Sequence, residues 1–398
     1  MTPDKQKTAL RKLTNPTLVY TKKAFARMIE TLQARTVIAL DTESDSLYSY
    51  YPKVCLIQIT SYADPDQPDA DQVIDFLLDP LRLADIGELG TLLADPQIEI
   101  ILHAADNDIL ILQRDFDFTF RNIYDTQLAA RILGTRRAGL NAILAENFGL
   151  TIDKRMQRTN WGKRPLTAQQ LTYAQMDTHY LLALRERQIQ ALKEAKRWEE
   201  AQEAFSHLER IDYHQRPHPE RTFWQTKAAR SVDRKRTNVL EAVWAWREKE
   251  AQQQNRPPFK IVSDRVLERL AMQTPENQAQ LAKIAGLSDY QLRRYGKAML
   301  AAVAEGKQQP LPKPPESAPR HTLDKATQAR YEALRNWRSK TARARGVDTD
   351  IVFNNSTLLA IAKRRPHSAA ELEEIVEIGP WKAKTYAPDI LPLVNGRA

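Results

Sequence analysis

The stretch VIALDTESDSL, residues 37–47, runs from four apolar residues directly into two carboxylates, Asp41 and Glu43. The apolar, partly β-branched start predicts a strand. Side chains two apart on a strand point to the same face, so the two acids would lie together. Neighbouring carboxylates repel each other unless a cation neutralises them, which makes the pair a candidate for a hard divalent ion. Taken alone, an acidic strand end explains the pair more simply.

A second apolar run, IEIILHA at residues 98–104, leads into the helical stretch ADNDILILQRDF at residues 105–116. This strand-to-helix edge carries Asp106 and Asp108. Asp108 is a candidate third acid of the same site. Asp106 competes for that role, although its side-chain oxygen could instead cap the helix. The residues themselves do not decide between the two.

Thr167 and Gln170 have the spacing of a capping box, and we expect a long helix to start there and continue to about Lys196. Tyr173 and Asp177 are four apart on this helix and share one face. An aspartate that faced the core would be costly to bury without a partner, and a metal ion would supply one. A solvent-facing aspartate is the alternative.

Four short apolar runs predict strands, and longer helical stretches alternate with them, so we expect an α/β domain. The runs are TVIAL at 36–40, VCLIQIT at 54–60, QVIDFLL at 72–78 and IEIILHA at 98–104. At 398 residues the chain is long enough for roughly two to four domains. It lacks a run of roughly 18 apolar residues and an apolar signal segment. We therefore expect a cytoplasmic protein with no membrane partner.

The last third of the chain contains a repeat with a spacing of 91 residues. Trp246 repeats as Trp337 and Tyr295 repeats as Tyr386, in one register without a gap. Apolar residues at three- and four-residue spacing predict a small all-helical domain in each copy. Between the copies, QQPLPKPPESAP at 308–319 predicts an extended linker. Two copies on such a linker suggest bivalent attachment to a partner.

Charge separates the two halves of the chain. Residues 1–210 have a net charge of −3 and residues 211–398 have +12. A cationic half suits a polyanion such as a nucleic acid, although a solvated cationic surface explains it too. Within the acidic half, tyrosines follow the first motif and a basic stretch follows residue 153. These aromatic and basic residues could form a single-strand channel, and they are Tyr48, Tyr50, Lys154, Arg155, Arg158, Lys163 and Arg164.

Three blocks, DTE at 41–43, HAADND at 103–108 and YAQMD at 173–177, resemble in order and spacing the exonuclease motifs of the DEDD superfamily. The tyrosine four before the last aspartate resembles the tyrosine subgroup. The chain from about residue 15 to 395 is similar to the ribonuclease D family, which joins a ribonuclease-H-like exonuclease domain to helical HRDC domains. The second repeat departs from the family pattern, with Asp350 in place of Phe259.

The resemblance implies metal-binding and catalytic roles for Asp41, Glu43, Asp108 and Asp177, and its spacing favours Asp108 over Asp106. It implies that Tyr173 orients or deprotonates the attacking water. Two divalent ions, Mg²⁺ or Mn²⁺, suit four carboxylates and the hydrolysis of a phosphodiester. Two histidines, His103 and His179, lie near the motifs, and we expect both to be structural.

These observations predict a 3′-to-5′ exoribonuclease that releases nucleoside 5′-monophosphates from single-stranded 3′ ends, with transfer RNA precursors implied by the resemblance. The alternatives are a DNA exonuclease and a nucleic-acid-binding scaffold with an inactive nuclease domain. No obligate protein partner is predicted. The expected domains are an exonuclease domain at 1–207, a linker at 208–229, helical domains at 230–306 and 321–398, and a proline-rich linker at 307–320.

Overall fold

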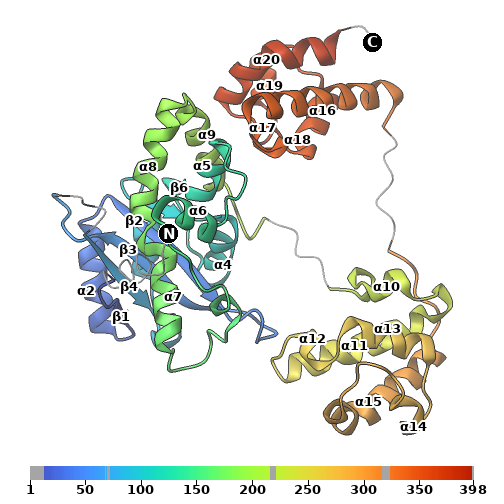
Figure 1. The fold of residues 1–398 in the computed structure, drawn as a ribbon. Helices are drawn as coiled ribbons and strands as arrows, with labels where there is room; N and C mark the ends of the chain where they lie inside the picture. The colour runs from blue at the N-terminus through green and yellow to red at the C-terminus, as the bar shows by residue number, and fades with distance from the viewer. Residues whose placement is uncertain (1–12, 68, 70–71, 216–220, 316–322, 397–398) are drawn as a thin grey trace. The chain divides into compact units, whose positions relative to one another are not determined.

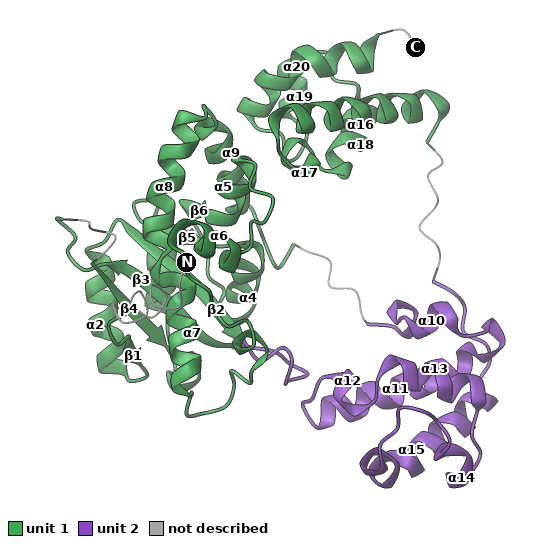
Figure 2. Ribbon diagram, in the orientation of Figure 1, with its two compact units in different colours: residues 1–43, 54–215, 322–398 green, residues 44–53, 216–321 purple. Residues whose placement is uncertain are grey.

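The computed structural model describes residues 13–67, 69, 72–215, 221–315 and 323–396. The chain forms two compact units (Figure 2). Unit 1 comprises residues 1–43, 54–215 and 322–398, and unit 2 comprises residues 44–53 and 216–321. Of the predicted proline-rich linker, residues 316–320 lie outside the described part of the chain.

Unit 1 contains a six-stranded mixed sheet with the strand order β1-β4-β3-β2-β5-β6 (Figure 1). The strands are β1 Thr17–Val19, β2 Val37–Ser44, β3 Val54–Tyr62, β4 Val73–Leu78, β5 Glu99–Leu102 and β6 Ile123–Asp125. β3 and β4 are antiparallel, whereas β1 with β4, β2 with β5, and β5 with β6 are parallel. The predicted α/β class and its four strands are confirmed. β1 and β6 were not predicted, because three-residue strands are too short to show a periodicity.

Helices cover both faces of this sheet (Figure 1). One face packs against α2, α3 and α4, and the other against α5, α7 and α8. The helices of this region are α2 Lys22–Gln33, α3 Gly87–Leu93, α4 Asp106–Phe116, α5 Thr126–Ile132, α6 Leu140–Phe148, α7 Ala168–His179, α8 Leu181–Glu194 and α9 Trp198–Leu208. Both faces of the central strands are therefore buried, as their near-continuous apolar sequences require.

The single helix expected from Thr167 to about Lys196 is two helices, α7 and α8, so that prediction is wrong about its length. The capping box is present, because the Gln170 amide donates to the Thr167 hydroxyl at 3.2 Å and the Thr167 amide donates to the Gln170 side chain at 3.0 Å. α7 ends at His179, and the residue that follows, Tyr180, has a φ of −98° and a ψ of 1°, which depart from helical values. The Tyr180 ring packs on Phe148, with ring centres 5.4 Å apart. A tertiary contact thus accompanies the break between α7 and α8. The local sequence gives no signal of this break.

Two sets of helices follow the repeat. The first set, in unit 2, is α11 Thr237–Gln253, α12 Pro258–Ile261, α13 Asp264–Gln273, α14 Gln278–Leu281 and α15 Asp289–Gln308. The second, in unit 1, is α16 Lys325–Arg345, α17 Thr349–Val352, α18 Asn355–Arg364, α19 Ala369–Glu373 and α20 Pro380–Asn395. A buried arginine repeats with its partner: Arg247 donates to Asp264 at 2.7 Å and Arg338 donates to Asn355 at 3.0 Å. The repeat therefore reflects one fold used twice.

The core of the first helical domain begins earlier than residue 230. Phe223 and Ala228, within the stretch expected to be a linker, are buried in that core. They belong to the short elements η3 Phe223–Gln225 and α10 Ala228–Ser231, which η4 Arg234–Arg236 follows. At its other end, α15 continues to Gln308, one residue into the predicted proline-rich segment. The sequence did not reveal the start of this core, because the elements there are short and rich in charged residues.

The second helical domain packs against the exonuclease region within unit 1 through buried charge. The Glu203 carboxylate of α9 accepts from the backbone amides of Trp381 at 2.6 Å and Lys382 at 3.2 Å, at the start of α20. The Arg345 guanidinium pairs with Glu200, which is 1% exposed. A carboxylate at a helix N-terminus is stabilised by the helix dipole.

Among the described residues, no helix is both long and apolar enough to cross a bilayer.

Candidate active site

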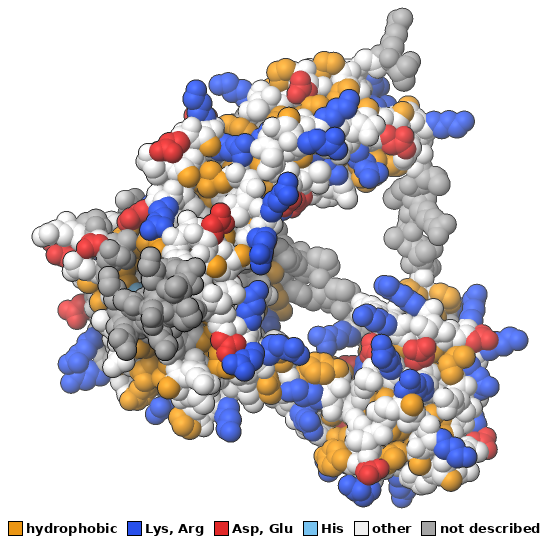
Figure 3. All heavy atoms as spheres, in the orientation of Figure 1, with side chains coloured by type: hydrophobic (Ala, Val, Ile, Leu, Met, Phe, Trp, Pro, Cys, Tyr) orange, Lys and Arg blue, Asp and Glu red, His pale blue; other side chains and the backbone are white. Residues whose placement is uncertain are grey.

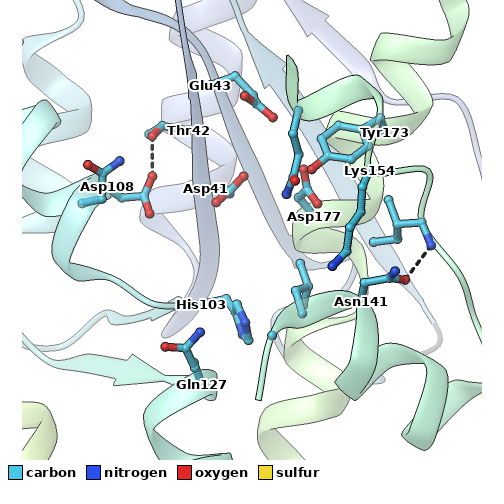
Figure 4. Close-up of a pocket in the computed structure, with 15 residues that line it drawn as sticks. Asp41, Thr42, Glu43, His103, Asp108, Gln127, Asn141, Lys154, Tyr173 and Asp177 are labelled. Carbon is cyan, nitrogen blue, oxygen red and sulfur yellow. Dashed lines mark hydrogen bonds between the residues drawn. The ribbon is translucent and has the colours of Figure 1, made fainter. Parts of the chain in front are cut away.

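Four acids from three separate segments line one cavity of about 410 Å³ (Figure 4). Asp41 and Glu43 lie on β2, Asp108 lies on α4 and Asp177 lies on α7. Figure 4 shows Asp41 between Asp108 on one side and Asp177 on the other. The structure therefore brings together all four acids that the three motifs predicted.

The strand alternation of β2 sets the direction of its two acids. Ile38 and Leu40 are buried in the core beneath α2, whereas Ala39 packs in the core on the opposite face, with residues of α5 and α8. Asp41 and Glu43 share the parity of Ala39, so they point toward the helical layer that contains Asp177. The buried apolar residues of the strand thus fix where its carboxylates point.

The structure places Asp108 at the cavity and leaves Asp106 outside it. Asp108 is 7% exposed, whereas Asp106 is exposed at the surface of the first turn of α4. Thr42, which lies between the two β2 acids, donates its hydroxyl to Asp108 (Figure 4). From the residues alone, the choice between Asp106 and Asp108 was open. Burial decides that Asp108 is the one that faces the cavity.

A further acid, Asp125 at the end of β6, holds the turn before α4 in place. Its carboxylate accepts from the backbone amides of Ala104 at 3.2 Å, Ala105 at 2.8 Å and Gln127 at 2.7 Å. Ala104 has a φ of +62°, in the left-handed region, and these bonds help to hold it there. The sequence analysis missed Thr42 and Asp125. The position of Thr42 between Asp41 and Glu43 was the available signal for the first, and β6 was too short to reveal the second.

Burial and mutual repulsion raise the pKa values of the four acids. Burial, together with Asp177 and Asp108, raises the pKa of Glu43 to about 9. Burial raises the pKa of Asp108 to about 7, although the hydrogen bond from Thr42 opposes this. Burial and the neighbouring acids also raise the pKa values of Asp41 and Asp177 well above the ordinary range. Four carboxylates that resist ionisation together are a site that a cation would stabilise.

The lining of the cavity fits magnesium or manganese better than zinc. Among the described residues, no group of three or more His, Cys, Asp or Glu side chains is arranged to hold a metal ion by itself. Mg²⁺ commonly takes only one or two protein carboxylates and completes its shell with water and substrate phosphate oxygens. Zinc sites use nitrogen and sulfur ligands, and His103 is the one such residue in the described lining. The acids therefore suit ions that are shared with a phosphate substrate.

Tyr173 reaches the same cavity from α7, one helical turn before Asp177. Its ring is 6% exposed and its hydroxyl hydrogen-bonds with Asp177 and Gln157. Burial and the neighbouring acids raise its pKa above the ordinary tyrosine value. The phenol thus lies next to the acids with a hydrogen to donate.

The two histidines near the motifs make structural contacts. His103 lines the cavity and its Nδ1 lies 2.9 Å from the Thr126 hydroxyl, while burial lowers its pKa to about 4. His179 Nδ1 lies 2.8 Å from the buried Asp75 carboxylate, away from the described cavity lining. These contacts agree with structural roles for both.

The basic stretch divides into one side chain at the cavity, three exposed side chains and one structural anchor. Lys154 lines the cavity (Figure 4). Arg155, Arg158 and Lys163 are exposed, and Arg155 pairs with Asp153 at 2.7 Å. Arg164 is different, because it donates to Asp79 at 2.6 and 2.8 Å and to three backbone carbonyls. Its donors are committed to the fold, so no contact with RNA is proposed for Arg164.

Tyr48 and Tyr50 lie in the 44–53 segment of unit 2. The Tyr50 hydroxyl contacts Glu248 at 3.0 Å and Gln252 at 3.1 Å, and its ring packs on the core of the first helical domain. The Tyr48 ring lies 3.5 Å from the ammonium of Lys260. Both tyrosines thus have protein partners, and their contact with RNA stays a prediction.

Similarity to known proteins agrees with this geometry. The 3′-5′ exonuclease family matches residues 16–190, and the HRDC domain matches residues 236–303 and 327–394. Ribonuclease D of Desulfotalea psychrophila is 30% identical over 81% of this chain and 84% of its own length. The chain belongs to the ribonuclease D family. Ribonuclease D of Granulibacter bethesdensis is 28% identical over 96% of this chain and 93% of its own. The protein is accordingly a 3′-5′ exoribonuclease by family.

Solved structures share the fold. Escherichia coli RNase D, described as an exoribonuclease involved in structured RNA processing, superposes with a TM-score of 0.63 at 23% identity, over 96% of this chain and 99% of that one. A protein from Bifidobacterium adolescentis superposes with a TM-score of 0.76 at 22% identity, over 96% and 97%. Both solved structures thus share the fold of this chain over nearly its whole length.

Proposed function

We propose that the protein hydrolyses RNA one nucleotide at a time from the 3′ end and releases nucleoside 5′-monophosphates, with two divalent cations, Mg²⁺ or Mn²⁺, held by four acids. The observation that carries the proposal is the convergence of Asp41, Glu43, Asp108 and Asp177 on one cavity. Without a cation their repulsion keeps them partly protonated, and positive charge that enters between them would let them ionise together. When bound, the ions supply a metal-activated water and charge stabilisation at the leaving 3′ oxygen.

The residues of the chain then have distinct tasks. Asp41 lies between Asp108 and Asp177 and can reach toward both halves of the cavity (Figure 4). Thr42 holds one oxygen of Asp108, which fixes the direction of that carboxylate. Ligands that are held by a hydrogen bond keep their geometry when the substrate arrives.

Tyr173 is placed to orient the attacking water. Its hydroxyl lies beside Asp177 and lines the cavity, so a water held between that acid and the phosphate can receive its hydrogen bond. Lys154 lines the same cavity and offers a positive charge to the scissile phosphate or its neighbour. Positioning and charge stabilisation together account for most of the catalysis that such a site needs.

Among physiological substrates we favour structured RNA precursors such as transfer RNA, because the family resemblance implies them. The cavity residues act on phosphates and do not report the sugar. Competition between RNA and DNA strands of equal length therefore tests the alternative of a DNA exonuclease. Preferential cleavage of DNA would overturn the proposed substrate while leaving the metal site in place.

The direct test is incubation of the full chain with 3′-labelled single-stranded RNA and Mg²⁺. We expect release of labelled mononucleotide, and a loss of at least about 10²-fold in kcat for Asp41→Asn and for Asp177→Asn. The exposed Asp106→Asn is the matched control, because it removes an acid from the same motif without reaching the cavity. No mononucleotide from the wild type, or equal rates for all three variants, would refute the proposal.

A further inference from the structure

Arg164 directs its charge into the protein, although it belongs to a basic stretch. Lys and Arg side chains protrude from much of the face drawn in Figure 3, whereas the Arg164 side chain is 23% exposed. A guanidinium has five N–H donors, and all five donors of Arg164 have acceptors at 2.6 to 3.0 Å. A cation that only keeps a surface soluble has no need of such an arrangement.

The acceptors of Arg164 belong to the sheet and to the chain just before it. Two bonds go to the Asp79 carboxylate, which directly follows β4, and one goes at 2.7 Å to the backbone carbonyl of Cys55 in β3. The other two go to the carbonyls of Trp161 at 2.6 Å and Lys163 at 3.0 Å. Arg164 therefore ties the chain before α7 to two neighbouring strands.

Asp79 is itself held in place. It is 8% exposed, and its amide donates to the Val19 carbonyl of β1 at 2.9 Å. Its carboxylate also accepts from the Leu81 amide at 3.2 Å. A planar guanidinium that meets a carboxylate through two parallel bonds fixes both distance and angle, which a lysine ammonium cannot do. The pair therefore specifies an orientation as well as an attraction.

The segment that Arg164 ties down, residues 151–163, reaches the active-site cavity. Three of its side chains line that cavity, and they are Ile152, Lys154 and Gln157. Gln157 also hydrogen-bonds with the Tyr173 hydroxyl. Regular structure in this segment is limited to one 3-10 turn, Met156–Arg158. A segment with so little regular structure depends on its tertiary contacts to keep a fixed position.

A second connection runs from Arg164 to Tyr173 through Trp161. The Trp161 side chain is fully buried in the same apolar cluster as Tyr173, and the two ring centres are 6.0 Å apart. Arg164 donates to the carbonyl of this tryptophan. A shift of that backbone would therefore move the ring that supports the tyrosine.

We propose that Arg164 is a positioning residue of the exonuclease site, which holds residues 151–163 against the sheet so that Lys154 and Gln157 keep their places beside Tyr173. This inference rests on the proposed function for the roles of Lys154 and Tyr173. Arg164 lies outside the described lining of the active-site cavity, so it acts through the segment that it holds. A displacement of about 1 Å in such groups can lower a rate roughly 10²-fold.

The first test compares Arg164→Lys with the wild type, as full-length chains, on 3′-labelled single-stranded RNA in Mg²⁺ below the unfolding transition. Lysine keeps the charge but has three donors on a flexible stem, so the paired bonds to Asp79 are lost. We expect kcat to fall roughly 10- to 100-fold. The fall in kcat should exceed any rise in KM, because the displaced groups act on the transition state.

A double-mutant cycle separates positioning from a general loss of stability. Gln157→Ala removes one side chain through which Arg164 acts, so Arg164→Lys should lower kcat by a smaller factor on that background than on the wild type. A residue that only stabilises the fold would lower kcat by the same factor on both backgrounds. Asp79→Asn weakens the same contact and keeps one acceptor oxygen, so it should show this pattern with a smaller loss, and it replaces Arg164→Lys if that variant does not fold.

Arg185→Lys is the matched control. Its side chain is 21% exposed, it pairs with Glu99 of the same sheet, and it lies outside the described cavity lining. The control changes a comparable buried ion pair, so its effect on kcat should be small and equal on both backgrounds.

Hydrogen exchange provides a readout that does not depend on activity. The amides of residues 151–163 should exchange at least about 10-fold faster in Arg164→Lys than in the wild type, and Arg185→Lys should leave them unchanged. Unchanged kcat in Arg164→Lys, equal factors on both backgrounds, or unchanged exchange of this segment would each overturn the proposal. A wild type that released no mononucleotide would refute the exonuclease function instead, and exchange would still decide whether Arg164 holds the segment.

Discussion

Replacement of Glu43 by glutamine should stabilise the metal-free protein while it inactivates the enzyme. In the folded protein, burial and two neighbouring acids raise the pKa of Glu43 from 4.5 to about 9. Between these values the folded protein holds a proton that the unfolded chain has released. The favourable contribution of Glu43 is therefore fully present below pH 4.5 and is lost as the pH rises toward about 9.

The size of this effect follows from the pKa. About 2.5 pH units separate an ordinary glutamate from neutral pH, and each costs about 1.36 kcal/mol, so the metal-free fold loses roughly 3 kcal/mol near neutral pH. Glu43→Gln cannot ionise and escapes this loss. For a domain of this size, roughly 3 kcal/mol corresponds to about 6 to 12 °C in Tm.

The assay is thermal unfolding in EDTA at about pH 5 and about pH 8. We expect the wild type to lose stability between the two and Glu43→Gln to lose less. Added Mg²⁺ identifies the unfolding transition of the exonuclease region, because a ligand at 100 times its Kd stabilises the fold by about 2.7 kcal/mol. This gain in stability should be smaller in Glu43→Gln than in the wild type. The exposed Glu146→Gln is the control. Equal pH dependence in wild type and Glu43→Gln would refute the assumption that this carboxylate is desolvated among acids.

Two further predictions concern a catalytic side chain and a domain contact. Tyr173→Phe keeps the buried ring and removes the hydroxyl beside Asp177, so kcat should fall roughly 10²-fold or more with little change in KM; an unchanged kcat would exclude a role for the hydroxyl. In Gly379→Ala the new Cβ would lie 2.4 Å from the Glu203 carboxyl carbon, so the second helical domain should be digested faster in limited proteolysis. Gly139→Ala, whose Cβ would meet nothing within 4 Å, should behave as the wild type, and equal digestion of both variants would argue against the Glu203 contact.

The two helical domains illustrate how one repeat can take two roles. Their buried arginines, Arg247 and Arg338, make matching contacts, so the fold is the same. Their surfaces differ at Phe259 and Asp350, and Asp350 pairs with Arg131 within unit 1. The departure from the family pattern at Asp350 is thereby explained as a contact within the protein. It also supports a mainly structural role for the second domain.

The sequence predicted the elements whose signals are local. Strands with long apolar runs, the capping box of Thr167 and Gln170, and the repeat of Trp246 and Trp337 all appear as expected. Elements that depend on distant partners were missed. The three-residue strand β6 exists through its pairing with β5, and α7 breaks at Tyr180, which packs on Phe148.

For the active site, the sequence by itself determined two pairs of fixed spacing, Asp41 with Glu43 and Tyr173 with Asp177. It left Asp106 and Asp108 as alternatives, and the resemblance to known exonuclease motifs favoured Asp108. Strand parity also determined that the first two acids share a face. These properties follow from covalent spacing, so one chain is enough to read them. The VIALDTESDSL stretch therefore predicted one central strand and two of the four acids of the candidate metal site.

Only the tertiary structure decided which side chains are buried and what they contact. It left Asp106 in solvent and put Asp108 in the cavity under the Thr42 hydroxyl. It also turned Arg164 from a candidate RNA contact into an anchor for Asp79. Burial and hydrogen bonding depend on segments that lie far apart in the chain. Burial and hydrogen bonding set the electrostatics of a site, because the pKa of a carboxylate changes only when other groups surround it.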